Sequence, residues 1–238
     1  MKEKFIWKIF QNYKKFFECL YFLRNARLLG KEFQNKGLEE IYNDLRMSKK
    51  FFIHQNKFEI LEFIKLIKLI NTGRICEIGT AEGGNLILLT HAVPTQTSFL
   101  SIDIRYPSQC HKLAFPLLIK SGTNLQLLEA NSSDPDTVIK MQSWLDSNLL
   151  DVLFIDGDHS YNGVQRDYEI YSPFIRKGGI IAFHDIVLDS STRFGIKSQS
   201  YVGDVPRYWK ELKSISTNYV ELVESSDQDG KGIGVIYK

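Results

Sequence analysis

The chain has few cysteines and no pattern that would pair them. Of its 238 residues only Cys19, Cys76 and Cys110 carry a thiol, an odd number, and none belongs to a C-x-x-C motif. A secreted chain would usually pair its cysteines in disulfides. We therefore expect three free thiols in a protein of the reducing cytoplasm.

Long apolar runs are absent too. No segment approaches the ~18 uninterrupted apolar residues that a membrane-crossing helix needs. Residues 1–24 mix lysines with aromatic side chains, and they lack the apolar centre and the small-residue cleavage site of a signal peptide. They have the character of a basic amphipathic helix, which either packs on its own domain or on a partner copy, or lies on an anionic membrane surface. We expect the helix to cover residues 2–29 and to end at Gly30.

The chain has almost no overall excess of either sign of charge, since its net charge is only +2. This small total conceals an asymmetry along the chain. Residues 1–70 hold 15 Lys and Arg against 8 Asp and Glu, whereas residues 71–238 hold 15 against 20. The change of sign falls where the first clear strand begins, which supports a boundary near residue 70.

Repeats and low-complexity tracts are missing, and a regular alternation of elements is present instead. We predict helices at 36–48 and 56–70, then strands at 74–78, 98–103, 125–129, 152–155 and 180–183, separated by helices at 84–93, 108–120, from Ser133 or Asp134 onward, and at 161–175. The segments 219–223 and 232–237 are predicted to form a hairpin. The fold class is therefore α/β, a Rossmann-like doubly wound sheet, mostly parallel, with an antiparallel C-terminal strand and N-terminal helices.

A glycine-rich loop follows the first strand of this pattern. It comprises Glu77, Gly79, Thr80, Ala81, Gly83, Gly84 and Asn85. Glycines between a strand and a helix let the backbone approach a ligand closely. Ala81 stands where the dinucleotide motif has its second glycine, which disfavours a nicotinamide cofactor. Asp103 ends the next strand, where an acid can accept hydrogen bonds from ribose hydroxyls.

Acids and histidines end two later strands. Asp156, Asp158 and His159 follow the fourth strand, and His184 and Asp185 follow the fifth. In an open α/β sheet, ligands bind just beyond the carboxyl ends of the strands, so these side chains should share one crevice. Their types suggest a metal ion and proton transfer.

In this order the motifs resemble a class I S-adenosylmethionine-dependent methyltransferase. More closely, they resemble its small-molecule O-methyltransferases, related to the macrolide-sugar and catechol-type enzymes and to cephalosporin-hydroxylase-like proteins. The resemblance covers residues 50–238 and leaves 1–49 as a basic helical extension. It implies that S-adenosylmethionine binds the glycine loop, Asp103 and Asp156. The loop after the third strand, with Asn131 and Ser132, would meet the adenine, although both also suit a plain turn.

The resemblance also implies a divalent cation, Mg²⁺ or Mn²⁺, at Asp156, His184 and Asp185. His184 stands where relatives usually have an acid, and imidazole prefers softer ions than Mg²⁺. Either the ion differs, or His184 does not bind it, or no metal is present. His159 occupies the position of the general base, and Asp156 would also take part in catalysis. Asp158 either orients His159 or caps the following helix.

The predicted function is O-methylation of a small hydroxylated molecule, such as a sugar or a natural-product intermediate. Two alternatives stay open: a cofactor-binding scaffold without turnover, and a cephalosporin-hydroxylase-like metal oxidoreductase. A nucleic-acid substrate is disfavoured because the catalytic region is net acidic and lacks an N-P-P-Y type loop. A homo-oligomer and membrane contact through residues 1–24 are both open.

The segment 187–208 is expected to be a lid or substrate loop in which Arg193, Arg207 and Trp209 contact the acceptor, unless a helix starts near Pro206 with Trp209 in the core.

Overall fold

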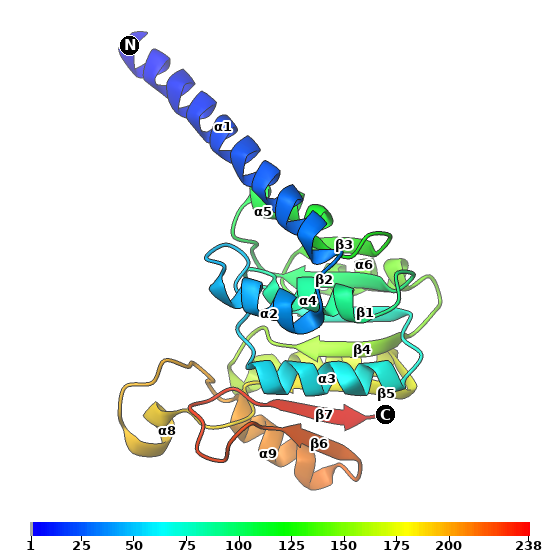
Figure 1. Cartoon of the computed structure of the whole chain (residues 1–238). Helices are drawn as coiled ribbons and strands as arrows, with labels where there is room; N and C mark the ends of the chain where they lie inside the picture. The colour runs from blue at the N-terminus through cyan, green and yellow to red at the C-terminus, as the bar shows by residue number, and fades with distance from the viewer. Residues whose placement is uncertain (1) are drawn as a thin grey trace.

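The computed structural model describes residues 2–238, with side chains from residue 13 onward. A seven-stranded sheet with the order β3-β2-β1-β4-β5-β7-β6 forms its centre (Figure 1). The strands are β1 (Arg74–Ile78), β2 (Ser98–Asp103), β3 (Asn124–Glu129), β4 (Leu150–Ile155), β5 (Ile175–His184), β6 (Tyr219–Leu222) and β7 (Ile233–Tyr237). The first five are parallel, and β7 lies antiparallel between β5 and β6. The predicted fold class is confirmed.

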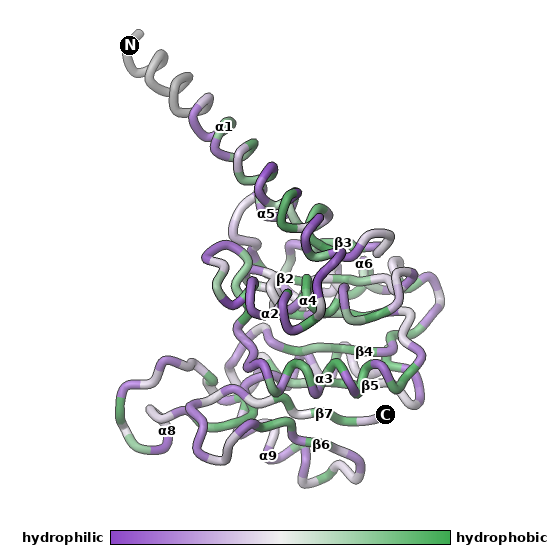
Figure 2. Tube along the Cα trace, in the orientation of Figure 1, coloured by the Kyte–Doolittle hydropathy of each residue, from purple (hydrophilic) through white to green (hydrophobic). Residues whose placement is uncertain are grey.

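Helices cover both faces of the sheet, because its central strands are apolar on both sides. The helices are α1 (Lys2–Phe33), α2 (Leu38–Met47), α3 (Lys57–Leu69), α4 (Gly84–Ala92), α5 (Gln109–Leu118), α6 (Pro135–Leu145), α7 (Tyr161–Tyr171), α8 (Ser190–Phe194) and α9 (Val205–Ile215). In β4, Val152 and Phe154 belong to one core and Leu153 and Ile155 to the other. This is why β4 reads as a continuous apolar run rather than an alternation (Figure 2).

Helix α1 does not end at Gly30, as the sequence suggested, but continues to Phe33. The glycine serves close packing instead of termination. A Cβ placed on Gly30 would lie 1.8 Å from the carbonyl oxygen of Leu117, at the end of α5. The absence of a side chain therefore lets the backbones of α1 and α5 approach each other.

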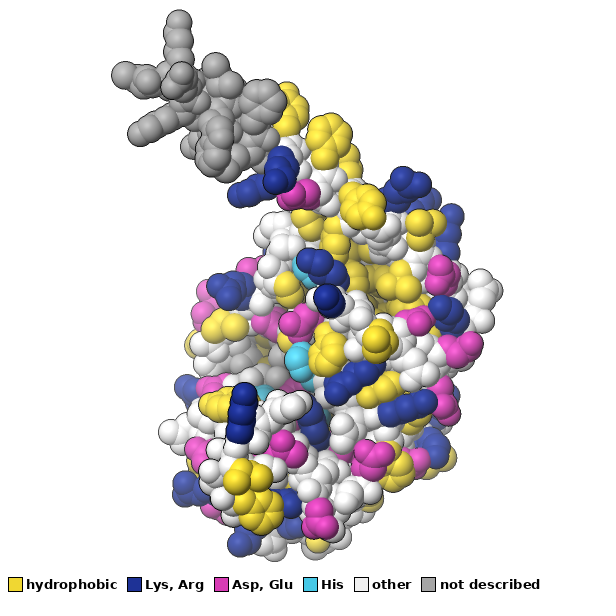
Figure 3. Space-filling view, turned by 60° about the vertical axis from the view of Figure 1, so that its left-hand side comes forward, with side chains coloured by type: hydrophobic (Ala, Val, Ile, Leu, Met, Phe, Trp, Pro, Cys, Tyr) yellow, Lys and Arg dark blue, Asp and Glu magenta, His cyan; other side chains and the backbone are white. Residues whose placement is uncertain are grey.

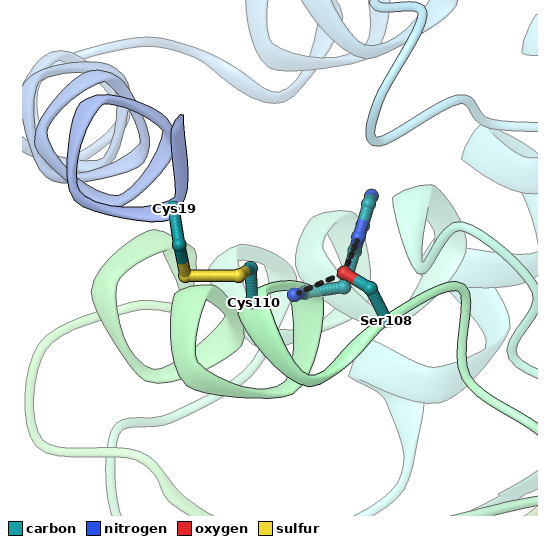
Figure 4. Close-up of a disulfide and its surroundings, with 4 residues drawn as sticks. Cys19, Ser108 and Cys110 are labelled. Carbon is teal, nitrogen blue, oxygen red and sulfur yellow. Dashed lines mark hydrogen bonds between the residues drawn. A yellow bond between two sulfur atoms is a disulfide. The ribbon is translucent and has the colours of Figure 1, made fainter. Parts of the chain in front are cut away.

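The prediction of three free thiols is wrong for two of them. Cys19 on α1 and Cys110 on α5 form a disulfide, with their Cα atoms 5.8 Å apart (Figure 4). This separation lies within the usual range for a disulfide, and it arises because α1 packs along α5. The two cysteines are 91 positions apart in the sequence, so spacing could not reveal the pair. Cys76 is free and buried in β1. The cytoplasmic location inferred from free thiols stays a prediction.

No helix within residues 2–238 has both the length and the apolar character needed to cross a bilayer. The long α1 projects from the body of the molecule, and only its C-terminal part lies against the sheet domain (Figure 1). The connection from β5 to β6 contains the short α8, an irregular stretch, and α9. Trp209 on α9 is 2% exposed, so the interpretation of a core tryptophan is confirmed.

Candidate active-site cleft

Two adjoining cavities open at the carboxyl ends of β1, β4 and β5. The histidine cavity, about 370 Å³, contains the ends of β4 and β5 and part of the segment 199–201. The Asp103 cavity, about 410 Å³, lies on the β2 and β3 side. Gly79, Ala81 and Asp156 line both cavities, so the two form one cleft divided by the loop after β1.

Most residues predicted for the site line this cleft. The histidine cavity is lined by Gly79, Thr80, Ala81, Gly84, Asn85, Asp156, His159, His184 and Asp185. The Asp103 cavity is lined by Gly79, Ala81, Asp103, Asn131, Ser132 and Asp156, together with Asp158. Glu77 and Gly83 line neither cavity. The topology thus brings together the carboxyl ends of five strands, β1 to β5, which are far apart in the sequence.

The glycines of the loop after β1 have separate packing roles. A Cβ on Gly79 would lie 2.0 Å from the carbonyl oxygen of Asp156, so glycine allows β1 and β4 to end side by side. Gly83 has a φ of 84° and caps α4 in the left-handed region. A Cβ there would lie 2.0 Å from the ring of Phe115. Gly83 therefore packs against α5, and its predicted contact with the cofactor stays a prediction.

Glu77 and Asn85 form a buried polar pair behind the loop. Asn85 Nδ2 donates to Glu77 Oε1 at 2.7 Å. Burial raises the pKa of Glu77 to about 8, although the hydrogen bonds from Asn85 and Thr80 oppose that rise. The other oxygens of the pair, Glu77 Oε2 and Asn85 Oδ1, are buried without a hydrogen-bond partner. Asn85 lines the histidine cavity, so its oxygen is available to a ligand donor there.

Asp103 is fixed by the backbone around it. Its Oδ2 accepts from the backbone N–H groups of Thr80 at 2.8 Å and Ala81 at 2.9 Å. Its Oδ1 accepts from the backbone of Arg105 at 2.8 Å. Each carboxylate oxygen has further lone-pair capacity, so Asp103 can hold the loop and still accept from a ligand hydroxyl.

The loop after β3 combines turn bonding with exposure to the cleft. Asn131 Oδ1 accepts from the backbone and side chain of Ser133, as in a plain turn. Ser132 Oγ donates to the buried Asp167 at 2.6 Å. Burial raises the pKa of Asp167 to about 6, against the opposing effect of that hydrogen bond. Both proposed roles of Asn131 and Ser132, as turn residues and as cavity lining, therefore coexist.

Asp156, His184 and Asp185 form a cluster that could hold a metal ion. Each offers one ligand atom, and these atoms lie within 4.8 Å of one another. His184 Nδ1 lies 3.1 Å from Asp156 Oδ1 and 3.5 Å from Asp185 Oδ2. Asp185 has a φ of 63°, a left-handed conformation that turns the chain immediately after β5.

The donor set fits a divalent cation. Two carboxylates and an imidazole suit ions from Mn²⁺ to Zn²⁺, and carboxylates alone suit Mg²⁺. Asp185 Oδ1 is buried without a hydrogen-bond partner, which leaves a strong acceptor facing no donor. Burial favours the neutral form of Asp156, yet His184 and His159 hold the pKa of its carboxyl below the ordinary value. Asp156 is thus ionised and ready to coordinate.

His159 lies beside the cluster with a defined orientation. Its Nδ1 contacts the carbonyl oxygen of Tyr201 at 2.8 Å, and the Tyr201 ring stacks on the imidazole at 5.9 Å between centroids. Its Nε2 lies 3.4 Å from Asp156 Oδ1. Burial lowers the pKa of His159, but the Asp156 and Asp185 carboxylates outweigh burial and raise the pKa to about 9. The sequence had suggested a value near neutrality.

The predicted set of site residues did not include several residues of the cleft. Gln55, before α3, donates from Nε2 to Asp156 Oδ2 at 2.8 Å. Ser200 and Tyr201 reach the histidine cavity from the segment after α8, and Lys231 reaches it from the turn before β7. The glycines on either side of Lys231 indicated a turn at this position. No sequence pattern indicated that this turn lies beside the cleft.

The arginines suggested as acceptor contacts do not line the cleft. Arg193 donates to the carbonyl oxygen of Ser226, and Arg207 lies over the ring of Tyr161. Neither lines either cavity. Ser200 and Tyr201, from the same segment after β5, line the histidine cavity instead, and the role of this segment as a lid or substrate loop stays a prediction.

Part of the chain is similar to a known family of domains. Residues 76–186 match the family model described as a methyltransferase domain. These residues span the loop after β1, the ends of β2 to β4, and the His184–Asp185 pair. This match agrees with the resemblance to methyltransferases that the motifs carry.

The chain is also similar to individual proteins and solved structures. The chain is 34% identical over 112 residues to the uncharacterized protein R132 of Acanthamoeba polyphaga mimivirus, which covers 46% of this chain and about half, 49%, of that protein. It is 26% identical over 201 residues to the probable caffeoyl-CoA O-methyltransferase 3 of Dictyostelium discoideum, covering 76% of each. An O-methyltransferase from Bacillus cereus, solved in complex with SAH, has a TM-score of 0.56 at 16% identity, covering 91% of this chain and 100% of that one.

Proposed function

We propose that the protein is an S-adenosylmethionine-dependent O-methyltransferase acting on a hydroxyl group of a small molecule. One observation carries the proposal: the two cavities share Gly79, Ala81 and Asp156. A nucleoside in the Asp103 cavity and an acceptor in the histidine cavity would then meet at the loop after β1. S-adenosylmethionine would supply a methyl group on a positively charged sulfur.

The loop after β1 and the end of β2 would hold the cofactor. Asp103 keeps its oxygens in place through three backbone N–H groups and can accept from ribose hydroxyls. Asn131 and Ser132 border the same cavity and would meet the adenine edge. Asn85 faces the other cavity with an unpaired oxygen, which suits the charged amino group of the methionine part.

The cluster at the ends of β4 and β5 would hold the acceptor. Asp156, His184 and Asp185 would bind a divalent cation there, which would supply positive charge that lowers the pKa of an acceptor hydroxyl. His184 in place of an acid favours Mn²⁺ or a softer ion over Mg²⁺. Gln55 keeps the Asp156 carboxylate oriented by donating to its second oxygen.

His159 would accept the hydroxyl proton at Nε2 once a cation at Asp156 and Asp185 offsets the carboxylate charges that raise its pKa to about 9. The Tyr201 carbonyl accepts from Nδ1, which selects the neutral tautomer with its lone pair on Nε2, the nitrogen nearer to Asp156. After proton transfer, Asp156 and Asp185 would stabilise the imidazolium. The residues of the cleft would then align oxygen, methyl and sulfur, and such alignment supplies much of the rate of a methyl transfer.

The acceptor, the domain limits and the assembly are proposals of the same kind. Polar side chains such as Gln199, Ser200 and Lys231 line the histidine cavity and support a hydroxylated acceptor such as a sugar. We place the methyltransferase domain at residues 50–238 and the basic extension at 1–49. α1 and α2 nevertheless contribute Ala26, Phe33 and Leu45 to the core on one face of the sheet. A homo-oligomer would be checked by sedimentation of the full chain.

Two measurements test the function. Calorimetry with S-adenosylmethionine, with and without Mn²⁺ or Mg²⁺, should show cofactor binding and a separate ion site. Transfer of labelled methyl from S-adenosylmethionine to a mixed pool of sugars and phenols should then identify the acceptor. Cofactor binding without transfer to any hydroxylated acceptor would favour the scaffold alternative, and consumption of 2-oxoglutarate would favour the oxidoreductase.

A further inference from the structure

Helix α1 has two halves whose apolar faces point in opposite directions. In the C-terminal half, Phe22, Ala26 and Phe33 face the sheet domain. In the half before it, five apolar residues recur at the i, i+3, i+4, i+7 and i+8 spacing of one helix face: Tyr13, Phe16, Phe17, Leu20 and Tyr21. All five are exposed, between 46% and 68%. We call these five residues the α1 stripe.

The C-terminal half is firmly attached to the domain. Phe22 packs on Phe51 at 5.4 Å and on His111 at 4.8 Å between ring centroids. Phe33 is 1% exposed, and the Cys19–Cys110 disulfide adds a covalent link between α1 and α5. The stripe is therefore on the side of the helix that this packing leaves uncovered, and it continues outward from the body of the molecule (Figure 3).

Basic side chains accompany the stripe. Residues 1–24 contain six Lys and Arg against two Asp and Glu. Lys14 and Lys15 are exposed; by the helical repeat, Lys14 lies at the edge of the stripe and Lys15 on the opposite side of the helix. An exposed apolar and aromatic face with lysines on the opposite face is the pattern of a helix that lies in the interface of an anionic membrane. At 1.5 Å per residue the stripe extends about 12 Å along the helix axis, so contact requires the helix to lie flat.

A second copy of the chain fits the stripe less well. Two such helices side by side would bring their excess positive charges together. Tyr13 and Tyr21 carry hydroxyls that would need partners inside a helix pair, whereas at a membrane interface they can reach water. The acidic balance of residues 71–238, 20 acids against 15 bases, also sets α1 apart as the basic surface that an anionic membrane would attract.

We propose that α1 docks the protein on an anionic membrane surface. The α1 stripe enters the boundary between headgroups and acyl chains, and Lys14 and Lys15 contact the phosphate and carboxylate groups of the lipids. The packing of Phe22 and Phe33 and the Cys19–Cys110 bond keep the domain at that surface. This docking does not depend on the methyl-transfer reaction proposed above.

The test is flotation of the full chain with vesicles of phosphatidylcholine alone and of phosphatidylcholine mixed with phosphatidylserine. The wild type should bind the mixed vesicles and bind the neutral ones far less. The variant Phe16→Gln/Phe17→Gln/Tyr21→Gln should partition roughly 100-fold less, because it removes most of the apolar contact. The variant Lys14→Gln/Lys15→Gln should partition about 30-fold less, at roughly fivefold for each lysine.

Matched controls use side chains of the same types elsewhere. Met47, Leu69 and Ile215 are 80–83% exposed and lie outside α1, so their combined change to Gln should leave vesicle binding intact. Lys49→Gln/Lys50→Gln should likewise bind normally. Circular dichroism checks that every variant is folded. The proposal is overturned if the stripe variant floats like the wild type, if neutral vesicles bind equally well, or if the stripe instead supports a dimer without binding vesicles.

Discussion

The two cavities of the cleft hold their carboxylates in different ways. In the Asp103 cavity, the acid accepts from three backbone N–H groups, which cannot move without disturbing the loop after β1. In the histidine cavity, Asp156 is contacted by the side chains of Gln55, His159 and His184, each of which has rotamers of its own. The first cavity is preorganised for a fixed ligand, and the second can rearrange around an added charge.

This difference predicts where substitutions act. Changes in the Asp103 cavity should alter affinity for the nucleoside and leave the chemical step intact. Changes in the histidine cavity should alter ion binding and turnover and leave the nucleoside affinity intact. The predictions below would sharpen or break that division, beginning with the largest expected effect.

Asp185→Asn should abolish most of the methyl transfer. The loss of one carboxylate from the Asp156, His184 and Asp185 cluster removes a charged ligand for the cation, and a rate loss of about 1,000-fold is the scale of several kcal/mol. Asn tolerates the left-handed backbone at this position, so the turn after β5 should persist. Calorimetry with Mn²⁺ and a methyl-transfer assay measure the two effects.

The exposed Asp146 is a matched control, because it also has a left-handed backbone and lies at the end of α6 away from the cleft. Asp146→Asn should keep normal activity and normal Mn²⁺ affinity. Undiminished Mn²⁺ binding by Asp185→Asn would show that this aspartate is not a ligand.

His159→Gln should reduce kcat by roughly 100- to 10,000-fold, the usual contribution of a positioned base. The affinity for S-adenosylmethionine should stay unchanged, because His159 is outside the Asp103 cavity and is not among the residues proposed to hold the cofactor. Single-turnover transfer and calorimetry separate the two quantities. The control is His91→Gln. In the wild type, His91 Nε2 contacts the carbonyl oxygen of Leu118 beneath α1. Normal turnover in His159→Gln would remove this residue from the mechanism.

The sheet and the main cleft residues could be predicted because their signals are local. Each strand is a short apolar run, and the acids that follow β4 and β5 must meet at one edge of a parallel sheet. The loop after β1 and Asp103 were predictable for the same reason. Strands β4 and β5 are longer than predicted. β5 begins at Ile175, before the Gly178–Gly179 pair that was expected to precede the strand.

The errors concern contacts between distant segments. Gly30 is a glycine because α5 approaches it, and nothing near it in the sequence identifies that neighbour. The Cys19–Cys110 bond depends on the same packing of α1 on α5. Lys231 comes to the cleft because β7 inserts beside β5, an arrangement set by the whole sheet.

Asp103→Asn tests the other side of the division. The Kd for S-adenosylmethionine should rise by about 10- to 100-fold, because hydrogen bonds to a charged acceptor contribute roughly 1.5–3 kcal/mol. At saturating cofactor, kcat and the affinity for Mn²⁺ should stay close to the wild type. Calorimetry measures both affinities. A large fall in kcat at saturation, with an unchanged Kd, would contradict the separate roles of the two cavities.

The smallest expected effect concerns stability behind the Asp103 cavity. Burial raises the pKa of Asp167 from 3.8 to about 6, so the folded protein binds this proton more tightly than the unfolded chain does. The stability that the neutral carboxyl contributes is present below pH 4 and is lost as the pH rises through about 6. Asp167→Asn stays neutral and can still accept from Ser132, so it should avoid that loss.

The variant should therefore be more stable than the wild type by about 2–3 kcal/mol at pH 8, where a pKa difference of about two units is fully expressed. Near pH 4 the two proteins should differ by only a few tenths of a kcal/mol. Urea unfolding at both pH values measures the difference, and the comparison at pH 4 is the internal control. An equal difference at both pH values would mean that the ionised Asp167 has no destabilising effect.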